Sequence, residues 1–289
     1  MFLEYGRGEL CRPRAFEERP YELSVGEGLA PPADYNEREA KRLPYKYVAL
    51  PLNLTTCGGF DIITVSDYRK EFTMASKKAA LALEFCERLE KIYPEAVCAL
   101  EYGGEPWRLL IMGRLSAQCT DARVNIVCRE LFERYPTAEA VANAELSELE
   151  DIVRPCGLYK TKAKNIKDAC IMLCGEYGGV LPDTMDELLK FPGVGRKIAN
   201  LLLGDIYKKP AIVTDTHCIR ICGRVGLYSE SLKDPVKIER ILVPLIPPEK
   251  QSDFCHRIVT FGRDTCTARS PKCGECPIAD ICKHKTADA

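Results

Sequence analysis

The sequence lacks a long hydrophobic run: no uninterrupted apolar stretch in its 289 residues is long enough to span a bilayer. Its first residues, 1–10, include two glutamates and no apolar core, so they do not form a secretory signal. The formal net charge of −1 gives no overall basicity that would indicate a nucleic-acid binder, although a local basic face can still attract a nucleic acid. These absences argue against membrane insertion and secretion, favour the reducing cytoplasm and leave the partner open.

Strand-like alternation is also absent from residue 74 onward, where apolar residues recur every three or four positions. Proline or glycine marks the breaks between these segments, as at 155–157 and 247–248. We therefore predict an all-α fold with helices over residues 74–93, 107–117, 121–135, 144–153, 162–177, 183–190, 196–207, 215–225, 235–246 and 250–262.

Residues 1–73 differ from the rest of the chain, because they are rich in Pro, Gly and Glu and show no sustained helical period. Two short strand-like runs, 48–50 and 62–65, give only a weak hairpin signal. We interpret the segment as an N-terminal extension that is poorly ordered or weakly structured and carries no chemistry. Met74 opens the first well-patterned helix and is therefore also a candidate for the true start of the protein.

Sixteen cysteines are many, but a reducing compartment argues against a disulfide framework. Most of them lie singly inside apolar helical runs, where cysteine behaves as a small hydrophobic residue. Four others fall within 17 positions near the C-terminus and outside any long helix: Cys266, Cys273, Cys276 and Cys282. This clustering predicts a metal site, and the spacing alone leaves structural zinc and an iron–sulfur cluster both open.

Residues 188–199 predict two helices joined by a tight hairpin. A mostly apolar segment stops at Pro192, Gly193 and Gly195 follow, and the next helix starts at Arg196. Outward-pointing N–H groups of the hairpin and of the first helical turn would make an anion site suited to phosphate. An ordinary turn between two helices is the alternative, and the position of Lys197 beside the anion site favours the functional interpretation.

Asp215 follows this hairpin by about one helix length, in the run 213–217. One interpretation is a helix N-cap. The other is a pair with Lys197, in which a partly desolvated lysine becomes a neutral amine nucleophile. The ionised carboxylate would take its proton and stabilise positive charge developing on a sugar ring. These residues alone leave both interpretations open.

Residues 74–285 resemble endonuclease III, a DNA glycosylase with AP-lyase activity in the helix-hairpin-helix superfamily. Four motifs match in order, at 115–121, 157–159, the hairpin through Lys197, and 213–217, and the cysteine spacing matches as well. In that family the cysteines hold a [4Fe–4S] cluster. The resemblance implies a helical barrel domain over 99–209 and an iron–sulfur cluster domain that joins 74–98 to 210–289.

The resemblance also implies roles for individual residues. Lys197 would attack the sugar C1′ to form a Schiff base, and Asp215 would assist it. The residues implied to contact DNA are Gln118 and Leu158, which fill the gap left by an extruded base, and Gly193, Gly195 and Arg196 at the hairpin. The implied partner is double-stranded DNA that contains damaged pyrimidines or abasic sites, bound by a monomer in the bacterial cytoplasm, at the nucleoid, with no membrane.

Two departures and two rivals qualify this expectation. Phe261 stands where family members often have His, and Thr214 replaces a common Val. Adenine-mismatch glycosylases share the fold but lack the lysine and carry an acid ahead of the intercalating segment, which 107–113 does not have. A cluster-bearing DNA-binding or redox-sensing module would need neither Lys197 nor Asp215. We therefore expect a bifunctional enzyme that removes oxidised pyrimidines and nicks the strand by β-elimination.

Overall fold

The computed structural model describes residues 65–284, with side chains described from Ser76 onward. The N-terminal extension predicted over 1–73 lies outside the described residues except for 65–73, which are helical. Helix α2 (Val65–Ile92) therefore begins before Met74, and the predicted start of the first helix is wrong. The charged run 69–71 has good helix propensity and lengthens the helix without adding an apolar period.

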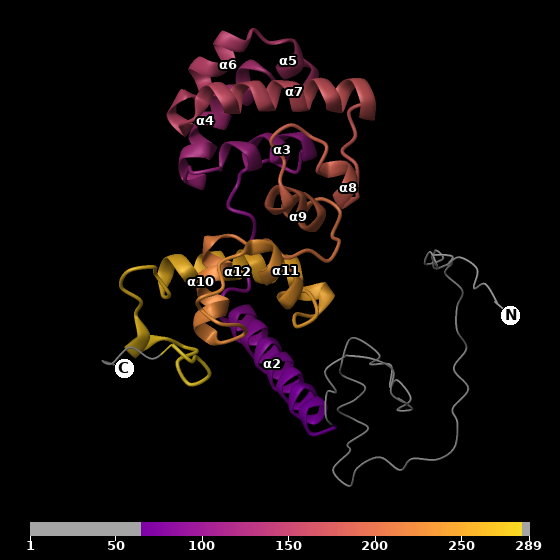
Figure 1. Ribbon diagram of the computed structural model, residues 1–289. Coiled ribbons are helices and arrows are strands. Elements are labelled where there is room, and N and C mark those ends of the chain that lie inside the picture. Colours follow the sequence, from indigo (N-terminus) through magenta and orange to yellow (C-terminus); the bar gives the residue numbers. More distant parts are fainter. Residues whose placement is uncertain (1–64, 285–289) are drawn as a thin grey trace, which may run out of the picture. The chain divides into compact units, whose positions relative to one another are not determined.

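Within 65–284 every regular element is a helix, so the predicted all-α fold is confirmed (Figure 1). The longer elements after α2 are α3 (Pro106–Leu115), α4 (Asp121–Arg134), α5 (Ala138–Asn143), α6 (Leu146–Val153), α7 (Tyr159–Tyr177), α8 (Met185–Leu188), α9 (Arg196–Asp205), α10 (Thr216–Val225), α11 (Pro235–Leu242) and α12 (Gln251–Asp264). Short 3-10 turns are η1 (Arg154–Cys156), η2 (Pro248–Lys250) and η3 (Cys273–Glu275). None of the described helices is long and apolar enough to cross a membrane.

Two predicted helices differ from the structure. The segment predicted over 144–153 is preceded by a separate helix, α5, whose N-cap Thr137 accepts the Ala140 N–H at 3.1 Å. The helix predicted over 183–190 is only the single turn of α8 in the structure, because Phe191 and Pro192 lead directly into the hairpin.

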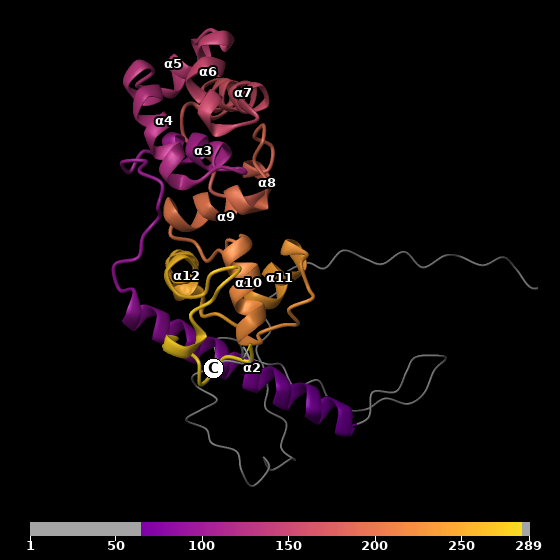
Figure 2. The same ribbon diagram turned by 90° about the vertical axis from the view of Figure 1, so that its left-hand side faces the viewer.

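Buried apolar side chains form two clusters. The first extends from Leu100 to Ala211 and is built by α3–α9. The second combines α2 with α10–α12, and its centre is Phe85, whose ring packs edge to face on Phe254 and Phe261 with centroids 5.6 and 6.4 Å apart. Figures 1 and 2 show the two groups of helices one above the other. These clusters support the division into 99–209 and 74–98 plus 210–289, which stays a prediction.

Helix α9 belongs to the first cluster and contacts α12 of the second. Its first residue, Arg196, reaches across to Glu239 of α11, with Nε to Oε2 at 3.0 Å and Nη2 to Oε1 at 2.5 Å. Because Glu239 is buried, this bidentate pair is a strong tie between the two groups of helices. Arg196 directly precedes Lys197, so its pair with Glu239 also fixes the start of the helix that carries the candidate nucleophile.

Candidate active site and cysteine centre

Lys197 and Asp215 line the same pocket, although they are separated in sequence and come from different groups of helices. Its walls are formed by residues 97–121, by α9 and by 255–263 of α12. The described part of the chain contains no ion pair between Lys197 and Asp215. The two side chains therefore line one cavity without forming an ion pair.

Lys197 lies in the first turn of α9 and is exposed. The partial desolvation expected from the sequence is therefore not supplied by the protein alone. Gly195 is the N-cap of α9 and gives it no side-chain cap, so the positive end of the helix dipole is open beside the lysine. This arrangement favours an anion next to the amine.

The structure explains the presence of glycine at one hairpin position but not at the other. Gly193 has a φ of +77°, and an added Cβ would lie 2.5 Å from Asn165 Nδ2 and closer still to Arg114 Nε. Gly195 has an ordinary φ of −106°, and a Cβ there would meet nothing within 4 Å. The fold therefore requires glycine at Gly193 but not at Gly195, where only a molecule bound from outside could demand close approach.

Several backbone N–H groups of the hairpin have no acceptor among the described residues. The Val194 N–H donates to Phe191 O and the Ala199 N–H to Gly195 O, both at 3.0 Å. No acceptor is found for the N–H groups of Gly193 and Gly195 or for those of the first two residues of α9. These free N–H groups are the ones that the predicted anion site beside Lys197 would use, and the site itself stays a prediction.

Asp215 is the N-cap of α10, and its Oδ1 accepts the Cys218 N–H at 2.7 Å. The capping interpretation is therefore confirmed. It does not exclude the functional interpretation, because the side chain is only half-buried and also lines the pocket of Lys197. The cap fixes one carboxylate oxygen, and no hydrogen bond within the described residues engages the other.

Gln118 and Leu158 share an uncommon backbone conformation. Both have left-handed φ values, 54° and 50°, which cost a non-glycine residue about 1–3 kcal/mol. Both are exposed, and Leu158 leaves 59% of its surface open although it is a large apolar residue. Strain and an exposed apolar side chain together indicate a functional surface.

Arg196 was predicted to contact DNA, but Glu239 engages its guanidinium. This hydrogen bonding raises the pKa of Arg196, and it directs the side chain toward α11. Only the backbone N–H of Arg196 is therefore left for the predicted anion site. Glu239 itself was missed by the sequence analysis, because 43 residues separate it from its partner.

The four C-terminal cysteines line one cavity together with Arg224, Phe261 and Ile278. Sulfurs bound to one tetrahedral zinc at about 2.3 Å would lie roughly 3.8 Å apart. Among the described residues the only three His, Cys, Asp or Glu side chains with ligand atoms within 4.8 Å of one another are Cys98, Asp205 and His256. No three of the four sulfurs are that close, so the cysteines do not form a ready-made tetrahedral zinc site in this structure.

Arg224 braces the loop that carries the first of these cysteines. It is buried, and its guanidinium donates to Cys266 Sγ at 3.3 Å, to Thr267 O at 2.7 Å and to Ala268 O at 3.1 Å. These three hydrogen bonds hold the Cys266 sulfur and the two residues that follow it against α10. Phe261, the departure noted in the sequence, is fully buried at the edge of the same cavity.

The fold and the site define a class: an all-α helix-hairpin-helix protein with a lysine–carboxylate pocket and a four-cysteine cluster site. Comparison with known proteins agrees. The profile of the HhH-GPD superfamily of base excision DNA repair proteins matches residues 111–248, and that of the iron–sulfur binding domain of endonuclease III matches 266–282. The second match confirms the predicted iron–sulfur cluster.

Relatives include endonuclease III of Synechocystis sp., 45% identical over 215 residues that cover 74% of this chain and 96% of the relative. Endonuclease III of Escherichia coli K12 is 35% identical over 206 residues, covering 71% and 96%. A solved non-covalent endonuclease III–DNA complex has a TM-score of 0.66 at 41% identity, covering 70% of this chain and 93% of that one. A trapped endonuclease III–DNA covalent intermediate has a TM-score of 0.65 at 42% identity, covering 69% and 92%.

The chain belongs to the endonuclease III family. It is accordingly a base excision repair enzyme, a DNA glycosylase with AP-lyase activity.

Proposed function

We propose that this enzyme removes oxidised pyrimidines from double-stranded DNA, with Lys197 as the nucleophile and Asp215 as its carboxylate partner. The observation that carries the proposal is the single pocket that both residues line without forming an ion pair. Its position beside an uncapped helix N-terminus supports a substrate that bears phosphates. The related proteins solved with DNA, one of them covalently trapped, support DNA as the substrate here.

The proposed reaction proceeds without hydrolysis of the glycosidic bond. Asp215 takes a proton from the Lys197 amine, which attacks C1′ as the bond from C1′ to the base breaks, and the base leaves with the electron pair. The ring opens to a Schiff base between Nζ and C1′. Loss of a proton from C2′ then expels the 3′ phosphate, which nicks the strand 3′ to the lesion. Lys197 is exposed in the free protein, so the bound DNA would supply the desolvation that its role needs.

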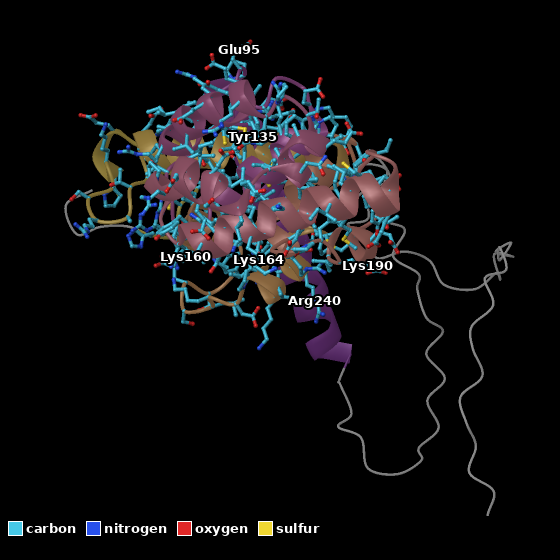
Figure 3. The ribbon with its side chains drawn as sticks, turned by 90° about the horizontal axis from the view of Figure 1, so that it is seen from above. Glu95, Tyr135, Lys160, Lys164, Lys190 and Arg240 are labelled. Carbon is cyan, nitrogen blue, oxygen red and sulfur yellow. The ribbon has the colours of Figure 1, made fainter. Side chains whose placement is uncertain are left out.

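The target atoms lie inside the base stack, so the nucleotide has to be extruded first. We propose that Gln118 and Leu158 enter the gap and offset part of the unstacking cost, on the order of a few kcal/mol. Their exposure and left-handed backbone support this role. The hairpin N–H groups would bind the DNA backbone. The exposed Lys160 on α7, labelled in Figure 3, adds positive charge near Leu158, whereas Lys164 pairs with Asp168 at 2.6 Å.

Cys266, Cys273, Cys276 and Cys282 would hold the [4Fe–4S] cluster, whose contribution is to hold a folded loop in place. The loop between the first two cysteines carries Arg269 and Lys272, which would contact phosphates. We further propose that the enzyme acts as a monomer in the cytoplasm, at the nucleoid.

Borohydride trapping tests the proposal, on a duplex that contains one thymine glycol and with Lys197→Gln as the control. The protein is iron-replete, and binding is measured in parallel. We expect a covalent adduct with the wild type, and with the variant normal binding, no adduct and no nick. If Lys197→Gln still nicks fully, Lys197 is not the nucleophile. If the wild type binds but gives no adduct, the Schiff-base mechanism fails and a monofunctional glycosylase or a binding module remains.

A further inference from the structure

Lys162 is the one lysine with no exposed surface among the described residues. It lies in the first turn of α7, and its ammonium donates to two backbone carbonyls, Leu115 O at 2.8 Å and Cys156 O at 2.7 Å. Burying an ammonium is costly, and the burial lowers the pKa of Lys162. A methionine would fill the same space without this cost, so packing alone does not explain a charged side chain at this position.

The two acceptors are the last residues of two helical elements. Leu115 ends α3 and Cys156 ends η1, so each carbonyl lies at the negative end of its element. No carboxylate within the described residues forms an ion pair with Lys162; the two carbonyls take the place of a counter-ion. One ammonium therefore joins two segments that are far apart in the sequence, the end of α3 and the end of η1. Leu115 is 47 residues from Lys162, whereas Cys156 is only 6 residues away.

Each tied carbonyl is followed closely by one of the two proposed gap-filling residues. The chain leaves α3 at Leu115 and reaches Gln118, and it leaves η1 at Cys156 and reaches Leu158. Both residues then adopt a left-handed φ. The anchor points of the two protruding side chains are thus held by the same Nζ atom.

We propose that Lys162 is a positioning residue that fixes the spacing of Gln118 and Leu158, so that the two side chains enter the gap in the duplex together. This inference rests on the proposed function of those residues. Without the ammonium, two buried carbonyls would lose their donor and the two loops would move independently. The cost would then fall on base extrusion and not on the chemistry at Lys197, which lies on α9.

The experiment compares Lys162→Met with Lys167→Met in the full-length, iron-replete enzyme. Lys167 is a matched control, because it lies on the same helix and its Nζ donates to the Ala144 carbonyl at 2.6 Å, away from both loops. Two substrates are used: a duplex with one thymine glycol, which requires extrusion, and a single-stranded oligonucleotide with an abasic site, which does not. A 2-aminopurine opposite the lesion reports unstacking by its fluorescence.

For Lys162→Met we expect single-turnover base release from the duplex to fall about tenfold or more, with a weaker 2-aminopurine signal. Nicking of the single strand should stay within about threefold of the wild type, as should both activities of Lys167→Met. A merely structural role would lower both activities of Lys162→Met together. That result, or two variants that behave alike, overturns the inference.

Thermal unfolding accompanies each variant, and if Lys162→Met does not fold, Lys162→Gln, which keeps a donor for one carbonyl, replaces it and is judged by the same criteria. The proposed function is judged separately. If the wild type fails to trap or nick, the proposed function fails, whereas an active wild type with an indifferent Lys162 refutes only this inference.

Discussion

The two hairpin glycines lead to opposite predictions, which separate what the fold needs from what DNA needs. At Gly193, alanine would have to adopt a φ of +77°, which costs about 1–2 kcal/mol. Its Cβ would also meet the outer parts of the Arg114 and Asn165 side chains, which can shift, so this contact adds little. We therefore expect Gly193→Ala to lower the free energy of unfolding by about 1–2 kcal/mol, or the Tm by roughly 2–8 °C.

At Gly195 the free protein should tolerate alanine. The backbone is extended and the Cβ meets nothing within 4 Å, so the Tm should change by less than about 2 °C. In the complex, the methyl group would stand among the N–H groups proposed to bind a phosphate. Losing one charge-assisted hydrogen bond there costs about 1.5–3 kcal/mol, or roughly tenfold to hundredfold in Kd.

The assay pairs thermal unfolding by circular dichroism with Kd by fluorescence anisotropy. The DNA is a duplex with a reduced abasic site, and the salt concentration is held fixed because phosphate contacts make Kd salt-dependent. The reasoning is refuted if Gly195→Ala lowers the Tm as much as Gly193→Ala does. It is equally refuted if Gly195→Ala leaves the Kd unchanged.

Two further predictions concern stability. Glu239→Gln should lower the free energy of unfolding in urea by about 1–3 kcal/mol, because Arg196 loses a buried carboxylate partner; an unchanged urea midpoint would contradict the importance of this pair. Burial raises the pKa of the Cys170 thiol to about 12, so the folded chain keeps a proton that the unfolded chain loses above about pH 8.5. Stability from this thiol is therefore complete below that pH and is lost as pH rises toward 12. Cys170→Ala should flatten the decline above pH 8.5 by about 1.4 kcal/mol per pH unit in urea titrations, and an identical slope would contradict this.

Most of the fold followed from the sequence because the helices have a regular apolar period and Pro or Gly at their ends. The misses occur where that signal is weak. Helix α5 buries only Val141, so it has no apolar stripe to detect. The start of α2 is a charged run, in which propensity extends a helix that periodicity does not mark.

The candidate site was predictable where the chemistry is local. The hairpin, Lys197 and Asp215 lie in short motifs, and the structure places Lys197 and Asp215 around one pocket. Contacts between distant segments were not predictable from those motifs, as Glu239 and Arg224 show. The burial of Lys162 has a signal in the sequence, because Lys162 falls on the buried face of α7 at helical spacing from Ile166, Ala169 and Leu173. A lysine in phase with an apolar stripe is worth testing as a buried cation.

The pocket takes its two catalytic candidates from different hydrophobic clusters, so its geometry depends on how those clusters are tied. Among the described residues, two arginine–carboxylate pairs reach between them beside the His256–Asp205 hydrogen bond, and the two pairs are unequal. Arg196, whose side chain is 42% exposed, holds Glu239, which is only 9% exposed, in a bidentate pair. Arg263 meets Asp121 at 2.5 Å on the pocket wall, but its side chain is 49% exposed, so the pair adds about 0–1 kcal/mol. We therefore expect a DNA phosphate to compete with Asp121 for Arg263 at little cost, whereas the bidentate pair beside Lys197 should persist and hold the proposed nucleophile in place.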